Sequence, residues 1–298
     1  MIHLSSCPLC HSTEISEVLQ VKDFTVSGES FPVFECHICT GRFTNDIPTQ
    51  AEIGKYYQAA SYISHSDARG GIVNTLYHFF RSLTVKSKRE MVKKYCKLRT
   101  GSLLDIGSGT GVFLNEMKKH DWKISGLEPD EKARERAASL HQVKSLEPEA
   151  IYSLHSETFD AVTMWHVLEH VHDIEGYLKQ VNKSLKEKGK FFIAVPNYTS
   201  ADAVHYKQFW AAYDVPRHLY HFSPGSMKKL LSANGFTLQA MVPLWLDSYY
   251  VSILSEKYKT GKENLVTASM VGSRSNAAAM LHTEKCSSVL YIAGKKIS

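Results

Sequence analysis

The stretch LLDIGSGTG, residues 103–111, decides the fold of this 298-residue chain. It is an aliphatic run that ends in Asp105, followed by a glycine-rich turn and by residues 112–119, which have helical apolar spacing. A second apolar segment, residues 123–128, then ends in Glu128. Strand, glycine turn, helix and strand in this order predict a parallel α/β unit that holds a nucleoside-type cofactor at the carboxyl ends of its strands.

The spacing of the glycines selects the cofactor. A dinucleotide-binding turn needs G-x-G-x-x-G, because its third glycine lets the helix pack on the strand with the pyrophosphate at the helix N-terminus. Counted from Gly107, that third position is Val112, and the pattern is instead D-x-G-x-G-x-G. A carboxylate at Asp105 suits an ammonium group, and Glu128 can accept hydrogen bonds from ribose hydroxyls. These residues predict a site for S-adenosylmethionine, which carries an α-amino group and a sulfonium but no phosphate.

Length and composition predict a globular chain with one large and one smaller domain. The chain is 43% hydrophobic and 22% charged, and its net charge of +5 is mild. Lysine and arginine are scattered rather than blocked, so this balance does not call for nucleic acid as a partner. No run of 18 apolar residues is present, so we expect no membrane-spanning helix. The first ten residues lack the regions of a signal peptide, and we expect a cytoplasmic protein with reduced thiols.

Four of the six cysteines form two C-x-x-C pairs, Cys7 with Cys10 and Cys36 with Cys39. In a reducing compartment this spacing predicts a zinc ribbon. Four thiolates at tetrahedral reach close the coordination sphere, so the zinc would be structural and not catalytic. The alternatives are a thiol-redox pair and a ribbon that has lost its metal. Redox chemistry is less favoured, because neither pair opens a helix in a βαβ unit.

Three regions follow from the pattern along the chain. We expect the zinc ribbon at 1–60, with short strands at 19–28 and 31–36. A helical linker or lid is expected at 61–99. The α/β domain is expected at 100–298, with a helical insertion at about 246–286. The alternation of strands and helices implies an α/β fold, with a seven-stranded, mostly parallel Rossmann-like sheet and an antiparallel edge at its end. Expected strands lie at 103–106, 123–128, 142–145, 159–164, 190–195, 236–242 and 289–293, and helices at 112–119, 131–140, 174–185 and 224–234.

Two histidine-rich segments follow strands of the expected sheet. WHVLEH (165–170) comes after the fourth strand, and DVPRHLYHF (214–222) comes after the fifth. Ligands bind beyond the carboxyl ends of such strands, so both segments are expected to face the acceptor. An O-methylation needs a base for the hydroxyl proton, and histidine suits this role because its pKa lies near neutrality. The candidate bases, among which the sequence does not choose, are His166, His170, His218 and His221.

His166, Glu169 and His170 also form H-x-x-E-H, the spacing of an inverted zinc-protease motif. A metalloprotease would need these residues on one long helix together with a distant third ligand. Here they directly follow an expected buried strand within an α/β alternation. The sequence therefore favours a substrate-side loop over a protease site.

LLDIGSGTG, GLEPD, FDAVTMWHVLEHVHD, FFIAVPN and PRHLYHFS together resemble the bacterial class I methyltransferases that include ubiquinone-pathway O-methyltransferases, over residues 100–242. The resemblance implies an S-adenosylmethionine-dependent methyltransferase and is specific for the cofactor but not for the acceptor. We expect a small-molecule acceptor that is methylated at oxygen, and a monomer or homodimer. The expected cofactor-binding residues are Asp105, Gly107, Ser108, Gly109, Gly111, Glu128, Pro129, Trp165 and His166.

Other acceptors remain open. The CPLC and CHIC pairs followed by YYQAASYISHS (56–66) resemble the N-terminal part of zinc-containing sugar C-methyltransferases, although the chain is shorter than those enzymes. C-methylation of a sugar is therefore an alternative. Some ribosomal-RNA methyltransferases also carry a zinc ribbon, but residues 7–39 hold five acidic residues against one lysine, and acidic surfaces repel phosphates. A non-catalytic partner subunit is disfavoured by the intact Asp105, glycines and Glu128.

Overall fold

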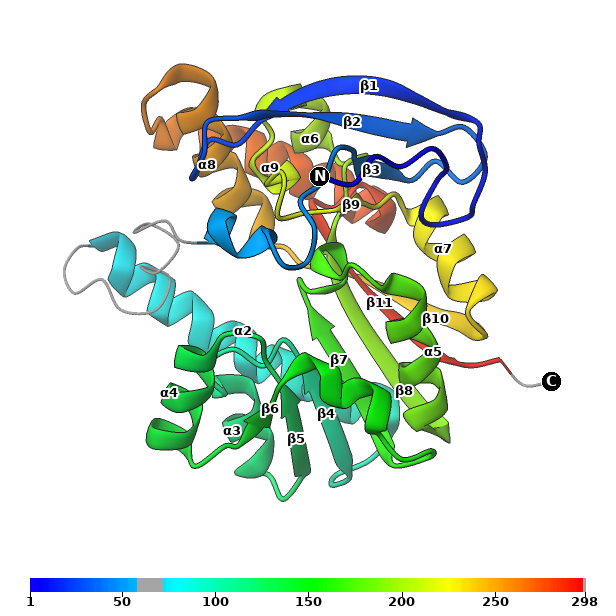
Figure 1. Ribbon diagram of the computed structural model, residues 1–298. Coiled ribbons are helices and arrows are strands. Elements are labelled where there is room, and N and C mark those ends of the chain that lie inside the picture. Colours follow the sequence, from blue (N-terminus) through cyan, green and yellow to red (C-terminus); the bar gives the residue numbers. More distant parts are fainter. Residues whose placement is uncertain (58–71, 297–298) are drawn as a thin grey trace.

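The computed structural model describes residues 1–57 and 72–296, and its larger part is a seven-stranded sheet of order β10-β11-β8-β7-β4-β5-β6 (Figure 1). Neighbouring strands are parallel except at β11, which runs antiparallel to β8 and β10. The expected Rossmann-like sheet is confirmed. Its strands are β4 (Ser102–Ile106), β5 (Lys123–Leu127), β6 (Ser145–Leu146), β7 (Phe159–Trp165), β8 (Leu185–Pro196), β10 (Phe236–Pro243) and β11 (Ser288–Lys295).

The antiparallel strand lies inside the sheet, so the expectation of an antiparallel edge is wrong. β11 sits between β8 and β10, and every residue of it except the last is buried. β10 is the edge strand, and most of its residues stay partly or fully exposed. The physical reason is the apolar run SVLYIAG in β11, which needs a strand on each side and helices on each face to be shielded from water.

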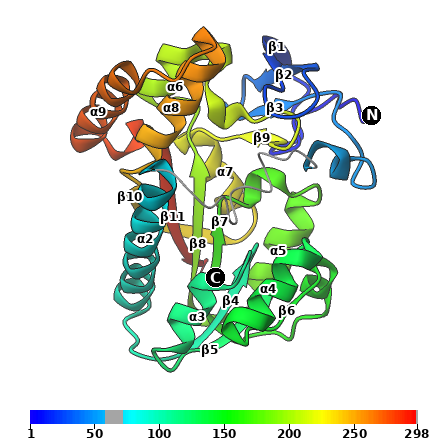
Figure 2. The same ribbon diagram turned by 90° about the vertical axis from the view of Figure 1, so that its left-hand side faces the viewer.

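Helices cover both faces of the sheet (Figure 2). Successive strand residues point to opposite faces, so Leu103 packs with one group of helices and Leu104 with the other. The first group is α2 (Ile72–Cys96), α3 (Val112–Lys118) and α4 (Glu131–His141), and the second is α5 (Ile174–Ser184) and α7 (Pro224–Ala233). α4, α5 and α7 begin where Asp130, Asp173 and Ser223 accept hydrogen bonds from first-turn backbone N–H groups.

A second sheet, of order β1-β2-β3-β9, is formed mainly by the N-terminal residues. Its strands are β1 (Ile15–Lys22), β2 (Ser30–Cys36), β3 (Arg42–Thr44) and β9 (Tyr220–His221). The strand expected at 19–28 ends at Lys22, because the Asp23 carboxylate accepts backbone hydrogen bonds from residues 25–27 and closes a turn. β9 belongs to the region assigned to the larger domain, so the N-terminal sheet is completed by that domain.

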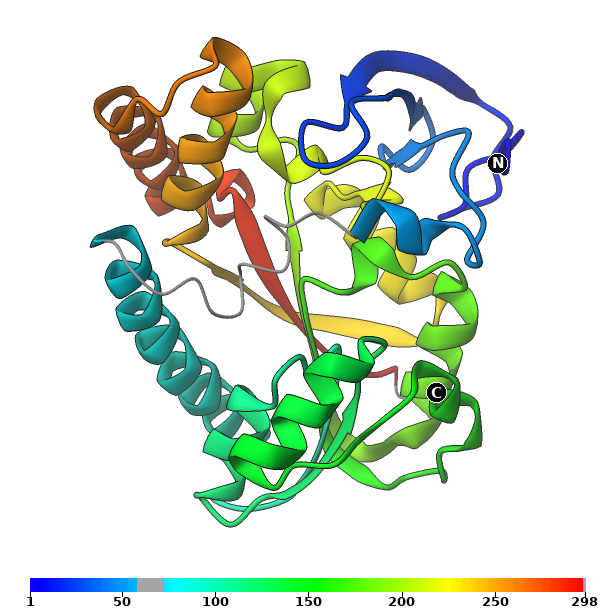
Figure 3. The same ribbon diagram turned by 60° about the vertical axis from the view of Figure 1, so that its left-hand side comes forward.

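Two helices, α8 (Asp247–Thr260) and α9 (Leu265–Leu281), lie between β10 and β11 in the chain. They lie beside the N-terminal sheet, above the carboxyl ends of the parallel strands (Figure 3). The rings of Phe24 and Tyr258 stack across this contact, with centroids 4.7 Å apart. α2 supplies the helix expected within 61–99, whereas 58–71, with most of the YYQAASYISHS segment, lies outside the described residues. Among the helices that the structure describes, none combines the length and apolarity that a membrane crossing requires.

Phe43 belongs to a hydrophobic cluster that also contains residues of the larger sheet, and its substitution tests whether the two sheets unfold together. Its side chain is fully buried, and its backbone pairs with Tyr220 of β9. We expect Phe43→Ala to lower the free energy of unfolding by about 3–5 kcal/mol. Three of the four tryptophans, Trp122, Trp165 and Trp245, lie outside the cluster that Trp210 shares with the N-terminal sheet, so tryptophan fluorescence during guanidinium unfolding reports mainly on the larger domain.

In Phe43→Ala this fluorescence transition should move together with the far-ultraviolet circular dichroism transition. Ile38→Ala, at an exposed position of the same N-terminal region, is the control and should leave both transitions in place. A fluorescence midpoint that stays unchanged in Phe43→Ala would show that the N-terminal sheet unfolds on its own.

Candidate cofactor and acceptor site

The glycine turn joins β4 to α3 in a conformation that few other residues adopt. Gly107, Gly109 and Gly111 have φ angles of 74°, 53° and 75°. At Gly107 a Cβ atom would also clash with Val167, so glycine lets the turn pack against the loop that follows β7. α3 begins after Gly111 without a side-chain cap, so no side chain competes with a ligand for its first backbone N–H groups.

Asp105 is buried at the end of β4, with 2% of its surface exposed. Its Oδ1 accepts a hydrogen bond of 2.6 Å from Thr163 Oγ1 on the neighbouring β7. Burial raises the pKa of Asp105 to about 7, against the lowering effects of the Thr163 hydrogen bond and the charge of Lys88. A cation placed against this carboxylate would remove much of the cost of ionising it.

Glu128 is oriented by backbone groups before any ligand binds. Its Oε2 accepts a hydrogen bond from Gly109 N at 2.7 Å, and its Oε1 accepts one from Asp130 N at 3.0 Å. Each carboxylate oxygen keeps a further lone pair, so ribose hydroxyls can still be accepted. Arg134 donates to the carbonyl oxygens of Glu128 and Pro129 and fixes the end of β5.

Two further predicted cofactor residues lie around this turn. The Ser108 hydroxyl contacts Ser145 Oγ at 2.7 Å and points toward β6. The Trp165 ring lies edge-on to Phe113, with centroids 5.7 Å apart, and Lys88 Nζ lies 4.4 Å from its centroid. The indole N–H of Trp165 is buried and has no hydrogen-bond partner among the described residues. It is therefore a donor available to a ligand.

His166 is held between two carboxylates. It has a φ of 57°, its Nε2 lies 3.0 Å from Asp247 Oδ2, and its Nδ1 lies 3.5 Å from Glu169 Oε1. Although desolvation lowers it, Asp247 and Glu169 together raise the pKa of His166 to about 10. His166 is thus a cation at neutral pH and has no lone pair for a proton. Asp247 opens α8, so the helical insertion contributes a charge to the site.

His170 and His218 form a different kind of pair. The His170 Nδ1 lies 3.0 Å from both the Arg217 carbonyl and the Tyr57 hydroxyl, and the His218 Nδ1 lies 2.8 Å from the Ala212 carbonyl. Carbonyl oxygens only accept, so Nδ1 carries a proton in each ring, an assignment made from these partners. The two rings meet edge to face, with centroids 4.5 Å apart.

The Nε2 of His170 is left for another partner, whereas the Nε2 of His218 lies 4.0 Å from Asp214 Oδ2. Burial, reinforced by His218, lowers the pKa of His170 to about 4, so His170 is neutral over the physiological range. In that state its Nε2 carries a lone pair that points away from the two Nδ1 contacts. His170 therefore has the protonation state that a proton acceptor requires.

Glu169 lies in one cluster with these two histidines. It is fully buried, and neither carboxylate oxygen has a hydrogen-bond partner among the described residues. Burial alone would raise the pKa of Glu169, but His166 lowers it by a larger amount. The net shift is therefore downward, and the carboxylate is ionised. One ligand atom each from Glu169, His170 and His218 lie within 4.8 Å of one another. The two oxygens of Glu169 and the Nε2 of His170 are acceptors that suit the hydroxyl groups of an acceptor molecule or a small cation.

The fourth candidate base, His221, lies apart from this group. It is part of β9, its Nε2 is 3.1 Å from Thr44 Oγ1, and burial lowers its pKa well below the ordinary value. The H-x-x-E-H residues also do not share a long helix, since β7 ends at Trp165 and only a 3-10 turn covers 168–170. This geometry disfavours the inverted zinc-protease alternative.

The four predicted zinc ligands form one cluster. Cys7 Sγ lies 3.6 Å from Cys39 Sγ, and Cys10 Sγ lies 3.5 Å from Cys36 Sγ. A tetrahedral site with Zn–S bonds of about 2.3 Å has sulfur–sulfur edges of about 3.8 Å, so these thiols fit zinc. The hydrogen bond from Cys7 lowers the pKa of Cys39 to about 5, which favours a thiolate at neutral pH.

Several residues at the site were not found by sequence reasoning. Lys88, Asp247 and Tyr57 reach the site from α2, from α8 and from the end of the N-terminal segment. No motif marks them, and Lys88 stands in a stretch rich in lysines. Arg217, considered as a substrate anchor or a partner of Asp214, is 1% exposed and bonds to Asp214 and Asp23. It is therefore a buried ion pair and does not face a substrate.

Comparisons with known proteins agree with this geometry. The sequence profile described as a methyltransferase domain matches residues 78–240, more than half of the chain. The chain is 28% identical over 137 residues to the ubiquinone biosynthesis O-methyltransferase of Pelagibacter ubique, covering 41% of this chain and 56% of that protein. The mitochondrial ubiquinone biosynthesis O-methyltransferase of Homo sapiens is 29% identical over 160 residues, covering 47% of this chain and 42% of that protein. The chain thus spans about half the length of these relatives.

The fold also matches a solved structure. An S-adenosylmethionine-dependent methyltransferase from Archaeoglobus fulgidus superposes with a TM-score of 0.50 at 18% identity, covering 76% of this chain and all of that one. At this identity the likeness shows a shared fold. With the profile match, it places the seven-stranded domain in one family. The chain belongs to the methyltransferase domain family, which its profile match over residues 78–240 identifies.

Proposed function

We propose that the protein transfers a methyl group from S-adenosylmethionine to an oxygen atom of a small-molecule acceptor. The observation that carries the proposal is the arrangement of two unlike groups around the loop after β7. One is the buried Asp105 with the glycine turn and Glu128, and the other is the cluster of Glu169, His170 and His218. When bound, S-adenosylmethionine supplies an electrophilic methyl group on its sulfonium. The names of the O-methylating relatives support oxygen as the acceptor atom.

The residues of the cofactor half fit the polar groups of S-adenosylmethionine. Asp105 would hold the ammonium group, and Glu128 would accept the ribose hydroxyls. Lys88 and the unpaired indole N–H of Trp165 are donors suited to the carboxylate group. The ammonium group of the amino-acid part then faces an acceptor, and its carboxylate group faces two donors. This donor and acceptor balance supports the assignment of the cofactor.

The acceptor half assigns the role of base to His170. It is neutral with Nε2 free, whereas His166 is already protonated and His221 lies in the other sheet. His170 would take the hydroxyl proton as the oxygen attacks, and the ionised Glu169 beside it would stabilise the imidazolium that forms. Positioning in a site that excludes water would contribute the remaining acceleration.

The transfer reaction and the role of His170 can be tested together. Methyl-labelled S-adenosylmethionine is incubated with the protein and three acceptor classes: small phenols with adjacent hydroxyls, nucleotide-linked deoxysugars, and ribosomal RNA. We expect a labelled methyl ether on a small hydroxylated molecule. His170→Gln should lower kcat by about 10²–10⁴-fold, as the loss of a general base does. It should leave the Kd for S-adenosylhomocysteine unchanged, because His170 is not among the cofactor residues.

His155→Gln, at an exposed position, is the matched control and should behave like the unmodified protein. Label found on a sugar carbon or on RNA would contradict the proposed acceptor and identify a different acceptor class. Full activity in His170→Gln would remove His170 from the mechanism.

Cofactor binding should depend on pH through Asp105. Its pKa is raised to about 7, so the carboxyl group is largely protonated at pH 6 and must lose its proton to pair with an ammonium group. The affinity for S-adenosylhomocysteine should therefore weaken as pH falls through 7, by roughly tenfold between pH 7.5 and pH 6. Calorimetry in buffers of different ionisation enthalpy should also detect proton release on binding.

Asp105→Asn should abolish this binding and its pH dependence. Because the raised pKa means that ionised Asp105 destabilises the folded state above pH 7, the same variant should raise the Tm of the cofactor-free protein at pH 8. Glu128→Gln is the comparison variant: it should weaken binding but keep a pH dependence, because Asp105 is still present. An affinity that is flat between pH 6 and 7.5 contradicts the role given to Asp105.

We further propose that the four clustered cysteines hold a structural zinc ion. The purified protein should contain close to one zinc per chain by mass spectrometry. Cys36→Ser should lose the metal and lower the Tm, since the fully buried Cys36 belongs to the hydrophobic cluster that includes Phe43. Cys96→Ser removes a thiol outside the cluster and should keep the zinc. A metal-free protein with four titratable thiols and an unchanged Tm in Cys36→Ser would rule the ion out.

A further inference from the structure

Arg217 contributes to the orientation of the His170 ring in two ways. The ring Nδ1 has two partners, the Arg217 carbonyl oxygen and the Tyr57 hydroxyl, each at 3.0 Å. The Arg217 guanidinium in turn donates through Nη1 to the Tyr56 carbonyl at 2.9 Å. Arg217 therefore contacts His170 directly through its own backbone, and it also holds the backbone next to Tyr57.

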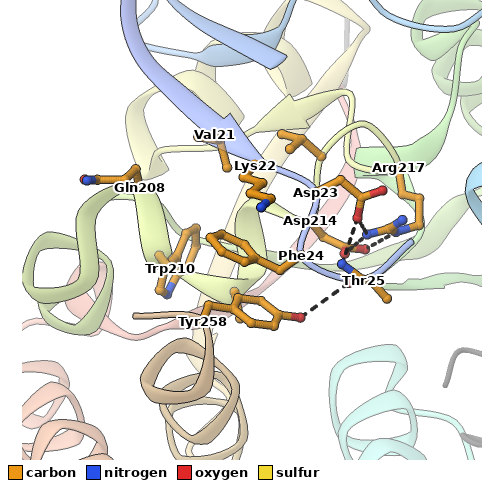
Figure 4. Close-up of a pocket in the computed structure, with 12 residues that line it drawn as sticks. Val21, Lys22, Asp23, Phe24, Thr25, Gln208, Trp210, Asp214, Arg217 and Tyr258 are labelled. Atoms are coloured by element: carbon orange, nitrogen blue, oxygen red, sulfur yellow. Dashed lines mark hydrogen bonds and ion pairs between the residues drawn. The ribbon is translucent and has the colours of Figure 1, made fainter. Parts of the chain in front are cut away.

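Arg217 is itself fixed by two carboxylates in a buried network (Figure 4). Its Nη2 donates to Asp23 Oδ1 at 3.0 Å and to Asp214 Oδ1 at 2.6 Å, and its Nε donates to Asp214 Oδ2 at 3.0 Å. The side chain of Arg217 is 1% exposed. A buried guanidinium keeps its place only while its partners compensate for lost hydration, so removing one of them disturbs the whole group.

Asp23 brings the N-terminal sheet into this network. It follows β1, and its two oxygens accept hydrogen bonds from the backbone N–H groups of Thr25, Val26 and Ser27 and from the Ser27 hydroxyl. Burial raises its pKa, but the bonds from Arg217 and Ser27 prevail and lower it, so Asp23 is ionised. The turn at 23–28 thus presents a rigid carboxylate to Arg217.

We propose that Asp23 and Arg217 are positioning residues for methyl transfer: through the Arg217 carbonyl they hold His170 as the Nδ1–H tautomer, with Nε2 turned to the acceptor. The N-terminal domain is then part of the reaction site and not only an attached module. The choice of His170 as the base rests on the proposed function, whereas the tautomer does not. The ionisable groups that face His170 are Glu169, His218, Asp214 and Tyr57.

The test reads the tautomer of His170 directly. Protein labelled with ¹⁵N in its histidine rings is examined by long-range ¹H–¹⁵N spectra at pH 7.5, and the His170 signals are identified by their loss in His170→Gln. In the unmodified protein we expect one protonated nitrogen, Nδ1, and one unprotonated nitrogen, Nε2. In Asp23→Asn the weaker hold on Arg217 should allow the proton to exchange between both nitrogens, so the two ¹⁵N shifts should move toward each other.

Glu35→Gln is the matched control. It weakens another ion pair of the N-terminal sheet, Glu35 with Arg42 at 2.7 Å, without touching Arg217, and it should leave the His170 shifts unchanged. A merely structural role for Asp23 would give the same result in both variants. If Asp23→Asn does not fold, Ser27→Ala, which removes one hydroxyl donor from Asp23 at an exposed turn position, is read in its place, with a smaller shift.

Two results would overturn the proposal: an unmodified protein with the proton on Nε2 of His170, or a folded Asp23 variant with unchanged His170 shifts. Calorimetry with S-adenosylhomocysteine on the same samples separates this outcome from failure of the proposed function. Absent binding in the unmodified protein would refute the cofactor assignment and leave the tautomer result standing. Equal binding in all variants, with altered His170 shifts only in the Asp23 or Ser27 variant, supports the positioning role.

Discussion

The buried carboxylate of Asp105 is the constraint on which the rest of the site depends. An ionised carboxylate away from water is expensive, and the raised pKa of Asp105 measures that cost. The fold tolerates it because β4 lies between two parallel strands, where Thr163 of β7 reaches across with a hydrogen bond. A sheet covered by helices on both faces gives such a strand end a fixed place and a dry surrounding. Without a ligand, the Asp105 carboxyl group is therefore partly protonated near neutral pH. Its ionised form destabilises the folded protein, and a bound cation would offset that destabilisation.

The acceptor side is built differently, from two sheets that share one segment. Residues 214–222 supply β9 to the N-terminal sheet, and the backbone at 217–219 bonds to Glu169 and His170 of the larger domain. The same few residues thus complete the N-terminal sheet and contact the turn at 168–170 that follows β7 of the larger sheet. A shift of the N-terminal sheet would be transmitted to the histidines through β9 and through the buried Arg217. This explains why so many aromatic and charged residues gather in one short stretch, which a plain surface loop would not need.

The sequence allowed the fold around the glycine turn to be predicted well, because LLDIGSGTG, the strands that flank it and Glu128 are local signals with a fixed spacing. The place of β11 was missed, since its apolar run shows that it is buried but not between which strands. The acceptor half could be predicted only as segments. Tyr57, Lys88 and Asp247 come from distant parts of the chain, and no local pattern marks them. Protonation was also hidden: His166 and His170 are four residues apart, yet their pKa values are about 10 and about 4. Only their neighbours in space explain that difference.

Glu169 lies near both of these histidines, and its charge would stabilise His170 once His170 is protonated. The carboxylate has no hydrogen-bond donor among the described residues, and its charge is balanced by the His166 cation. A proton that moves to His170 would create a second cation next to the same carboxylate, with no side chain having to reorient. Preorganised charges of this kind act most strongly in a site without water. The resting His170 is then a weak base that stays in its accepting form, and the stabilisation by Glu169 is greatest when the proton arrives. A histidine of ordinary pKa would be partly protonated beforehand, and that fraction of the protein would be inactive.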